Sequence, residues 1–259
     1  MEKKIVFIDI DGTLFDHEHN RVHQSTVEAI NKLRENDIYV FVASGRSRIM
    51  ALQVLDRYDI KVDGYVFING QYVIYKDEVI YKNPISKEFL QKFITECEQV
   101  GEDYGFMTEH DYTVSSHSDR VVESFVNFKM KIPDINKEIF KTDDVFQGLI
   151  FDLKNIDYFN DKYKDYVKFI PWLGKGADIV PKNGSKANGI SYVLKKLGAK
   201  RENVYAIGDS YNDIEMIKFA NYGIAMGNAN DTLKKVADYV TDDITKDGLY
   251  KAMKHYKLI

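Results

Sequence analysis

The sequence predicts an α/β protein in which a doubly wound parallel sheet carries a second, inserted α+β module. One observation is a nearly continuous apolar run, Ile5–Ile10, of the kind found in strands that are buried on both faces. A second is that such runs alternate with amphipathic stretches up to Ile68. A third is that this alternation stops there and returns at Lys186. Together these observations indicate one discontinuous core with an insertion.

The first half of the core is expected to contain βαβ units. The segment from Ser25 to Glu28 fits a capping box, with apolar residues at helical spacing behind it. Right-handed crossovers between parallel strands then give a doubly wound, Rossmann-like sheet. The elements expected after this helix are a strand at 38–43, a helix at 48–58 and a strand at 64–68.

The pattern changes after Ile68. Asn69–Gly70 is a turn signal, and the segments 72–75 and 79–81 predict a hairpin. An amphipathic helix at 86–100 ends at Gly101. Short strands at 112–115, 146–153, 167–170 and 177–180 and two shorter helices complete an α+β insert.

The α/β pattern then resumes. The expected elements are a helix at 186–197, a strand at 204–207, a helix at 212–219, a strand at 222–226 and a helix at 231–237. We therefore divide the chain into a core at 1–82 and 184–259 and an inserted module at 83–183.

Composition excludes several classes of protein. Of the 259 residues, 44% are hydrophobic and 29% charged, which is ordinary globular usage and excludes a fully disordered chain. The net charge of −4 argues against a dedicated nucleic-acid binder. One cysteine, Cys97, permits no internal disulfide and no cysteine zinc cluster. Without an apolar run of about 18 residues we expect no membrane partner, and we expect a cytoplasmic protein.

Polar residues follow several of the predicted core strands. Asp9, Asp11, Gly12 and Thr13 follow the first strand, and Ser44–Gly45 follow the second. Open α/β sheets bind ligands at the carboxyl ends of their strands, so these groups should meet at one edge of the sheet. They would offer carboxylates to a divalent cation, and hydroxyl and N–H groups to a phosphate. Two further groups should join them there: Lys186, a fixed cation that opens a helix, and the segment Gly208–Asp213, which follows the strand at 204–207.

The order and placement of these motifs resemble those of the haloacid dehalogenase superfamily. An insertion after the third strand, and none between Thr13 and the Ser25 helix, is similar to that of the Cof-type (subclass IIB) phosphatases. The resemblance implies a phosphoric monoester hydrolase that uses Mg²⁺. Its substrates would be small phosphorylated metabolites, with sugar phosphates as the leading class. It also implies that the insert at 83–183 is a cap that selects the substrate.

The resemblance implies a role for each motif residue. Asp9 would be the nucleophile that forms an aspartyl-phosphate, and Asp11 the general acid and base. Mg²⁺ would be held by Asp9, the Asp11 backbone carbonyl and Asp209, with Asp213 in support. The residues expected to bind the phosphoryl group are Thr13, Ser44, Gly45, Lys186 and Asn212.

Other interpretations remain open at this point. A phosphomutase or phosphotransferase on the same fold would carry the same core motifs, and a non-enzymatic phospho-acceptor switch would need only one phosphorylated aspartate. Arg46 is expected either in a structural ion pair or at the rim of the site. The three histidines of the loop 17–23 are expected to be solvated. The sequence leaves the choice between monomer and homodimer undetermined.

Overall fold

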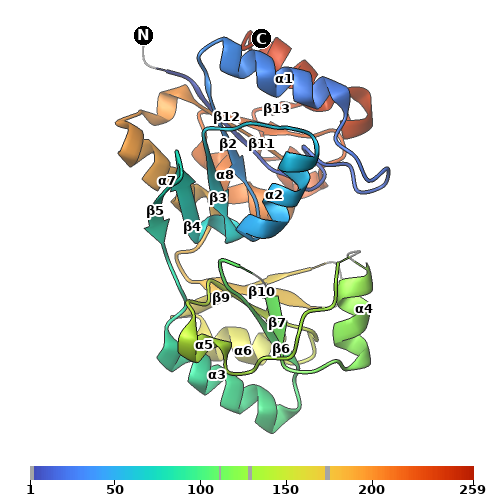
Figure 1. Cartoon of the computed structure of the whole chain (residues 1–259), viewed down its shortest axis with the longest axis vertical. Helices are drawn as coiled ribbons and strands as arrows, with labels where there is room; N and C mark the ends of the chain where they lie inside the picture. The colour runs from blue at the N-terminus through green and yellow to red at the C-terminus, as the bar shows by residue number, and fades with distance from the viewer. Residues whose placement is uncertain (1–2, 111, 128–129, 173–175) are drawn as a thin grey trace. The chain divides into compact units, whose positions relative to one another are not determined.

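The chain forms two compact units. In the computed structural model, which describes residues 3–110, 112–127, 130–172 and 176–259, unit 1 comprises Met1–Lys82 and Ser185–Ile259, and unit 2 comprises Asn83–Gly184 (Figure 1). The second boundary lies one residue later than the sequence pattern suggests.

Unit 1 is built on an eight-stranded sheet with the order β13-β12-β11-β1-β2-β3-β4-β5. The strands from β13 to β3 are parallel, and β4 and β5 form an antiparallel hairpin at one edge. The predicted doubly wound fold class is thus confirmed. The strands are β1 (Ile5–Ile8), β2 (Tyr39–Ala43), β3 (Gly64–Phe67), β4 (Tyr72–Tyr75), β5 (Glu78–Lys82), β11 (Val204–Gly208), β12 (Tyr222–Ala225) and β13 (Tyr239–Val240).

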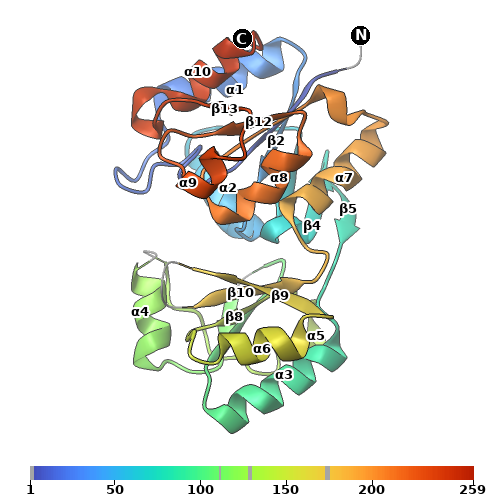
Figure 2. The same ribbon diagram turned by 180° about the vertical axis from the view of Figure 1, so that it is seen from behind.

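Helices cover both faces of this sheet. α1 lies beside α10, and α7 lies beside α8 on the opposite face, as Figures 1 and 2 show from the two sides. The central strands are fully buried between the helices, and β1 is accordingly an unbroken run of apolar residues. The helices are α1 (Gln24–Glu35), α2 (Arg48–Arg57), α7 (Lys186–Leu197), α8 (Ile214–Phe219), α9 (Asp231–Lys234) and α10 (Gly248–His255).

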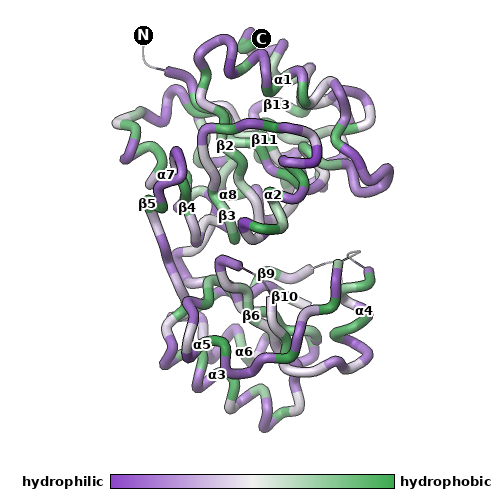
Figure 3. The backbone as a smooth tube through the Cα atoms, in the orientation of Figure 1, coloured by the Kyte–Doolittle hydropathy of each residue, from purple (hydrophilic) through white to green (hydrophobic). Residues whose placement is uncertain are grey.

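Unit 2 is an antiparallel sheet with helices. The sheet order is β7-β6-β8-β10-β9, and one apolar cluster joins α3 and α6 to β6, β8, β9 and β10. Figure 3 shows its hydrophobic residues alternating with hydrophilic ones along the chain. The elements are α3 (Lys87–Val100), β6 (Tyr104–Met107), β7 (Tyr112–Val114), α4 (Asp119–Asn127), α5 (Ile139–Thr142), β8 (Gln147–Ile150), α6 (Ile156–Tyr163), β9 (Val167–Pro171) and β10 (Ala177–Pro181).

Several local predictions were wrong. α1 begins at Gln24 with His23 as its N-cap and no side-chain cap, so the predicted capping box is absent. The Ser25 hydroxyl donates to Asp247 instead, 2.6 Å away. The pattern also missed β6, β13 and α10, and it gave two short helices in unit 2 where the structure has α4, α5 and α6. Cys97 is fully buried in the apolar cluster of α3.

Candidate active site

The site lies where the strand order of unit 1 reverses. β1 pairs with β2 on one side and with β11 on the other, and both neighbours are parallel to it. The loops that follow β1 and β11 therefore leave the same edge of the sheet, at the position where open α/β sheets bind ligands. The backbone N–H of Asp9 donates to Ile207 O at 3.0 Å and ties the start of the first loop to β11.

Three carboxylates and one ammonium group form the centre of the site. One oxygen from each of Asp9, Asp209 and Asp213 lies within 4.8 Å of the other two. Lys186 Nζ donates to Asp9 Oδ1 and to Asp213 Oδ1, both at 2.6 Å. Lys186 and Asp213 are fully buried and Asp9 is 4% exposed. Residues from the loops after β1 and β11 and from the start of α7 thus meet in one cluster.

The charges in this cluster do not balance. Burial raises the pKa of Asp9 well above its usual range; Lys186 opposes this effect, while Asp213 and Asp209 add to it. Burial and the charge of Asp213 raise the pKa of Asp209 to about 7. Burial alone would lower the pKa of Lys186, but Asp213 and Asp9 raise it. Three carboxylates therefore share one ammonium group, and their hard oxygen donors fit a divalent cation such as Mg²⁺.

Gly12 allows the loop after β1 to pass close to Asp209. Its φ is +80°, and a Cβ placed there would lie 2.3 Å from Asp209 Oδ2. The next residue, Thr13, is fully buried and donates from its hydroxyl to Asp209 Oδ1 at 3.2 Å. The expected contact of Thr13 with the phosphate stays a prediction; the structure shows its hydroxyl bonded to Asp209. Asn228, which the sequence analysis did not single out, donates to Gly12 O at 2.7 Å.

Asp11 is held by a separate set of partners. Arg46 Nη2 donates to Asp11 Oδ1 at 2.6 Å and Arg46 Nε to Asp11 Oδ2 at 3.0 Å. His17 Nε2 lies 2.5 Å from the same Oδ1. Burial raises the pKa of Asp11, but the hydrogen bonds from His17 and Arg46 outweigh burial and lower its pKa below the usual range. The structure thus holds Asp11 as a carboxylate.

These contacts show the surroundings of Arg46 and of the three histidines in the loop 17–23. Arg46 forms an ion pair, and its partner is a motif residue, so it belongs to the site. The guanidinium also lies 5.6 Å from the centre of the Phe15 ring, and His17 meets the same ring edge-on. His17 and His19 are exposed, as expected for a solvated loop, whereas the His23 side chain is only 11% exposed. Asp16 lies 2.8 Å from His19 Nδ1 and 2.9 Å from His23 Nε2.

Asp213 and Asn212 organise the loop after β11. Asp213 Oδ2 accepts from the backbone N–H groups of Asp209 and Ser210 at 3.0 and 2.9 Å. Both Asp213 oxygens are therefore engaged, one with the loop and one with Lys186. Asn212 Nδ2 donates to Asn69 Oδ1 at 3.0 Å.

Ser44 and Gly45 lie beside Asn69 and Asn212: a Cβ placed on Gly45 would lie 3.6 Å from Asn212 Nδ2. Ser44 is fully buried, and its hydroxyl accepts from Arg46 N–H at 3.1 Å, which leaves its own O–H able to donate. A Cβ placed on Gly45 would lie 3.2 Å from Asn69 Oδ1. From the sequence, Asn69 was expected only as a turn residue. Its place directly after a central strand, like that of Asp9, was the signal that could have marked it.

Comparison with known proteins gives the family. The family model described as haloacid dehalogenase-like hydrolase matches residues 6–253. The chain belongs to the haloacid dehalogenase-like hydrolases. The predicted membership of this superfamily, in its Cof-type branch, is confirmed.

Several relatives of this hydrolase are named phosphatases. "Putative phosphatase YkrA" of Bacillus subtilis (strain 168) is 32% identical over the full length of both chains. The solved structure of the phosphatase BT1666 from Bacteroides thetaiotaomicron superposes with a TM-score of 0.92 at 28% identity, covering 100% of this chain and 96% of that one. The subclass IIB sugar phosphatase BT4131 gives a TM-score of 0.88 at 33% identity, covering 99% of this chain and 100% of that one. The hydrolase is therefore a phosphatase, as the sequence predicted.

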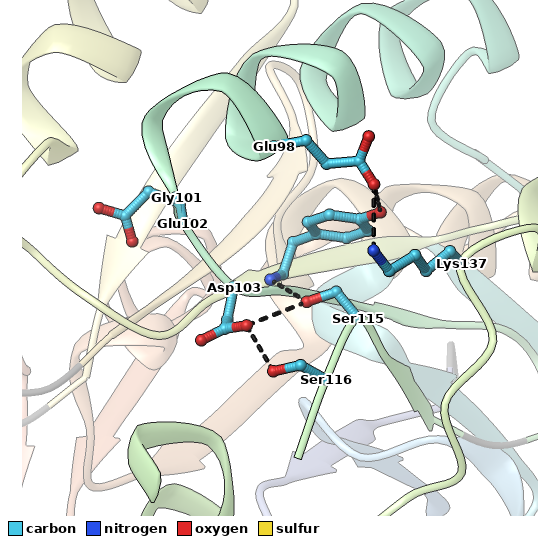
Figure 4. A pocket seen from close by; sticks show the side chains of 8 residues that line it. Glu98, Gly101, Glu102, Asp103, Ser115, Ser116 and Lys137 are labelled. Atoms are coloured by element: carbon cyan, nitrogen blue, oxygen red, sulfur yellow. Dashed lines mark hydrogen bonds and ion pairs between the residues drawn. The ribbon is translucent and has the colours of Figure 1, made fainter. Parts of the chain in front are cut away.

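Unit 2 contains a polar pocket of about 380 Å³ that no motif residue lines. Figure 4 shows hydrogen bonds among its polar groups: Asp103 accepts from Ser115 and Ser116, and Lys137 donates to Glu98. Among the described residues, no helix combines the length and the apolar character that a membrane crossing requires.

Proposed function

We propose that the protein is a Mg²⁺-dependent phosphatase that hydrolyses small phosphorylated metabolites through an aspartyl-phosphate on Asp9. The observation that carries this proposal is the division of the two front carboxylates between separate partners. Asp9 belongs to the buried cluster with Lys186, while Asp11 lies outside that cluster with Arg46 and His17. Two carboxylates with different surroundings suit two different tasks, one nucleophilic and one in proton transfer.

The reaction demands several effects at once. Enzymes accelerate phosphate monoester hydrolysis by up to ~10²¹-fold, whereas one general acid or base supplies about 10²–10⁴. Mg²⁺, held by Asp9, the Asp11 carbonyl and Asp209, would polarise the phosphoryl oxygens and offset their charge. Asp213 would support this arrangement by fixing the loop that carries Asp209.

In the first step, an Asp9 oxygen bonds to phosphorus while the bond to the leaving oxygen breaks, and Asp11 gives that oxygen a proton. In the second step, a water oxygen attacks phosphorus, Asp11 takes the water proton, and the bond to Asp9 breaks. Lys186, Ser44, the Gly45 N–H and Asn212 would hold the transferring group. The described contacts of Asp11 favour its carboxylate, the form needed in the second step. We therefore propose that these contacts rearrange before the first.

Sugar phosphates are the substrate class we favour. The support is the similarity to BT4131, a sugar phosphatase 33% identical to this chain. We propose that unit 2 acts as the cap that selects among substrates.

Two substitutions test the proposed roles. Asp9→Asn removes the nucleophile and a metal ligand, so we expect no phosphoenzyme and weaker Mg²⁺ binding. Asp11→Asn keeps the backbone carbonyl, so Mg²⁺ affinity should change little while turnover falls by about 10²–10⁴. With p-nitrophenyl phosphate, whose leaving group needs no proton, phosphoenzyme should accumulate in Asp11→Asn.

Calorimetry measures the Mg²⁺ affinity, and intact mass after an acid quench measures the phosphoenzyme. Covalent phosphate on Asp11 in Asp9→Asn would contradict the assignment. Phosphoryl transfer to a second sugar without release of free phosphate would identify a phosphomutase instead.

A further inference from the structure

The turn that follows β3 has an unusual backbone. Ile68 and Asn69 both have a φ of +51°, in the left-handed region, and both are 1% exposed. For a β-branched residue such as Ile68 this conformation is a genuine outlier and is energetically unfavourable. Such a conformation persists only where the surrounding structure fixes it, and it is typical of functional sites.

This turn contacts three of the loops that carry motif residues. Ile68 N–H donates to Arg46 O at 3.1 Å, and Asn69 N–H donates to Ser44 O at 3.0 Å. Gly70, with a φ of +89°, packs so closely on the start of α7 that an added Cβ would lie 1.9 Å from Ser185 O. The Asn69 side chain reaches the loop after β11 through Asn212.

The Asn69 amide is fixed between two groups that we assign to phosphate binding. Its oxygen accepts from Asn212 Nδ2, and both its oxygen and its nitrogen face Gly45, where an added Cβ would lie 3.2 and 3.4 Å away. The Gln71 side chain donates from Nε2 to the backbone oxygen of Asn69 at 3.0 Å, and this bond also helps to fix the turn. Asparagine suits the position because it tolerates the left-handed region better than most residues and carries a short amide.

We propose that Asn69 is a positioning residue for phosphoryl transfer. Its side chain holds the Asn212 side chain in one rotamer, and its backbone N–H, which Asn69→Gly retains, donates to Ser44 O and fixes the Ser44–Gly45 loop, so that both meet the phosphoryl group without rearrangement. The inference rests on the proposed function, because it takes Asn212 and Gly45 as phosphate-binding groups. Asn69 itself needs no contact with the substrate.

The test uses Asn69→Gly in the full-length protein. Glycine adopts a φ of +51° without strain, so the substitution removes the side-chain amide while the backbone can keep the conformation of the turn. We expect kcat/KM for p-nitrophenyl phosphate to fall about 10- to 100-fold and the inhibition constant of inorganic phosphate to rise. The matched control is Asp59→Gly, which changes a residue with a φ of +50° in unit 1 that contacts no motif residue among the described contacts, and its kinetics should equal those of the wild type.

A double-mutant cycle separates positioning from a merely structural effect. If Asn69 acts through Asn212, Asn69→Gly combined with Asn212→Ala should be little worse than Asn212→Ala alone. Additive losses, or wild-type kinetics in Asn69→Gly, would overturn the inference while leaving the proposed function intact. Wild-type kinetics and phosphate inhibition in Asn212→Ala would refute the role assigned to Asn212, and the inference with it.

A second measurement is independent of turnover. The side-chain amide signal of Asn212 in a nitrogen–proton NMR spectrum should shift in Asn69→Gly and stay in place in Asp59→Gly. An unchanged signal in folded Asn69→Gly would show that Asn69 does not hold Asn212.

Discussion

At the scale of single residues, the site is defined by how its charges are paired. Asp11 has Arg46 and His17 as partners, and Lys186 is shared by Asp9 and Asp213. Asp209 receives only the Thr13 hydroxyl among its described side-chain contacts. Burial and the charge of Asp213 outweigh the opposing effects of Lys186 and Thr13, so the pKa of Asp209 is raised to about 7.

This raised pKa predicts that Mg²⁺ affinity depends on pH. Below about pH 7 the Asp209 carboxyl of the ligand-free protein carries a proton, which Mg²⁺ must displace, because only the carboxylate is a ligand. Affinity should rise with pH up to about 7 and level off above it. Calorimetry in buffers of different ionisation enthalpy would count the released protons.

The control for this titration is Asp209→Asn, which should bind Mg²⁺ weakly and lose the proton release near neutral pH. A wild-type affinity that stays constant from about pH 5.5 to 8 would contradict the prediction. Full turnover after exhaustive EDTA treatment would contradict Mg²⁺ dependence itself.

At the scale of elements, the first residue of α7 is explained by the contacts of the site and not by the stability of the helix. Lys186 is its first residue, where a positive charge opposes the helix dipole. The ion pairs of Lys186 with Asp9 and Asp213, and not a helix preference, explain why a lysine stands at the first position of the helix. The helix is secured at its ends by the Ser185 N-cap, whose hydroxyl accepts from Asn188 N–H at 3.1 Å, and by Gly198 in the left-handed region.

We predict that Ser185→Ala weakens both stability and turnover. Loss of the N-cap should lower the free energy of unfolding of unit 1 by about 1 kcal/mol, and the looser start of α7 should reduce kcat several-fold. Denaturant unfolding and steady-state kinetics measure the two effects.

The matched control is Ser86→Ala, which removes the equivalent N-cap of α3 in unit 2, where the hydroxyl accepts from Phe89 N–H at 3.2 Å. It should cost a similar free energy and leave kcat unchanged. An equal loss of kcat in both variants would show that stability alone, and not the placement of Lys186, explains the effect.

At the scale of the whole molecule, the chain crosses between the two units twice. The crossings lie at Lys82–Asn83 and Gly184–Ser185. The side chains of Asn83 and Asn183 meet at 3.1 Å, so the two ends of unit 2 lie side by side. Each unit has its own sheet and apolar core, which makes unit 2 an independent module in the architecture.

Replacing residues 86–180 by a short linker should therefore leave a folded unit 1, because the ends to be joined are already adjacent. This shortened protein carries every proposed catalytic residue, so it should still hydrolyse p-nitrophenyl phosphate slowly. It should lose discrimination among sugar phosphates. Circular dichroism checks folding, and unchanged selectivity in a folded variant would refute the assignment of substrate choice to unit 2.

Predictions from local pattern were least successful where an element depends on distant partners. α10 begins at Gly248, and its N-cap Asp247 lies in the left-handed region and makes no side-chain cap hydrogen bond, so the usual N-cap interaction does not stabilise its start. Its buried residues Leu249, Ala252 and Met253 show that packing, including contact with α1, stabilises it. The two-residue strand β13 is defined only by its pairing with β12.

The sequence by itself determined the fold class, the phosphatase family and the motif residues, because buried strands are continuous apolar runs and the motif residues directly follow strands or begin a helix. Only the tertiary structure decided what those residues touch. It shows that the Thr13 hydroxyl bonds to Asp209, that Arg46 and His17 bond to Asp11, and that Asn69 bonds to Asn212. Asn69 and Asn212 are 143 positions apart, and a contact across that separation follows from the order of strands in the sheet, which no local pattern encodes.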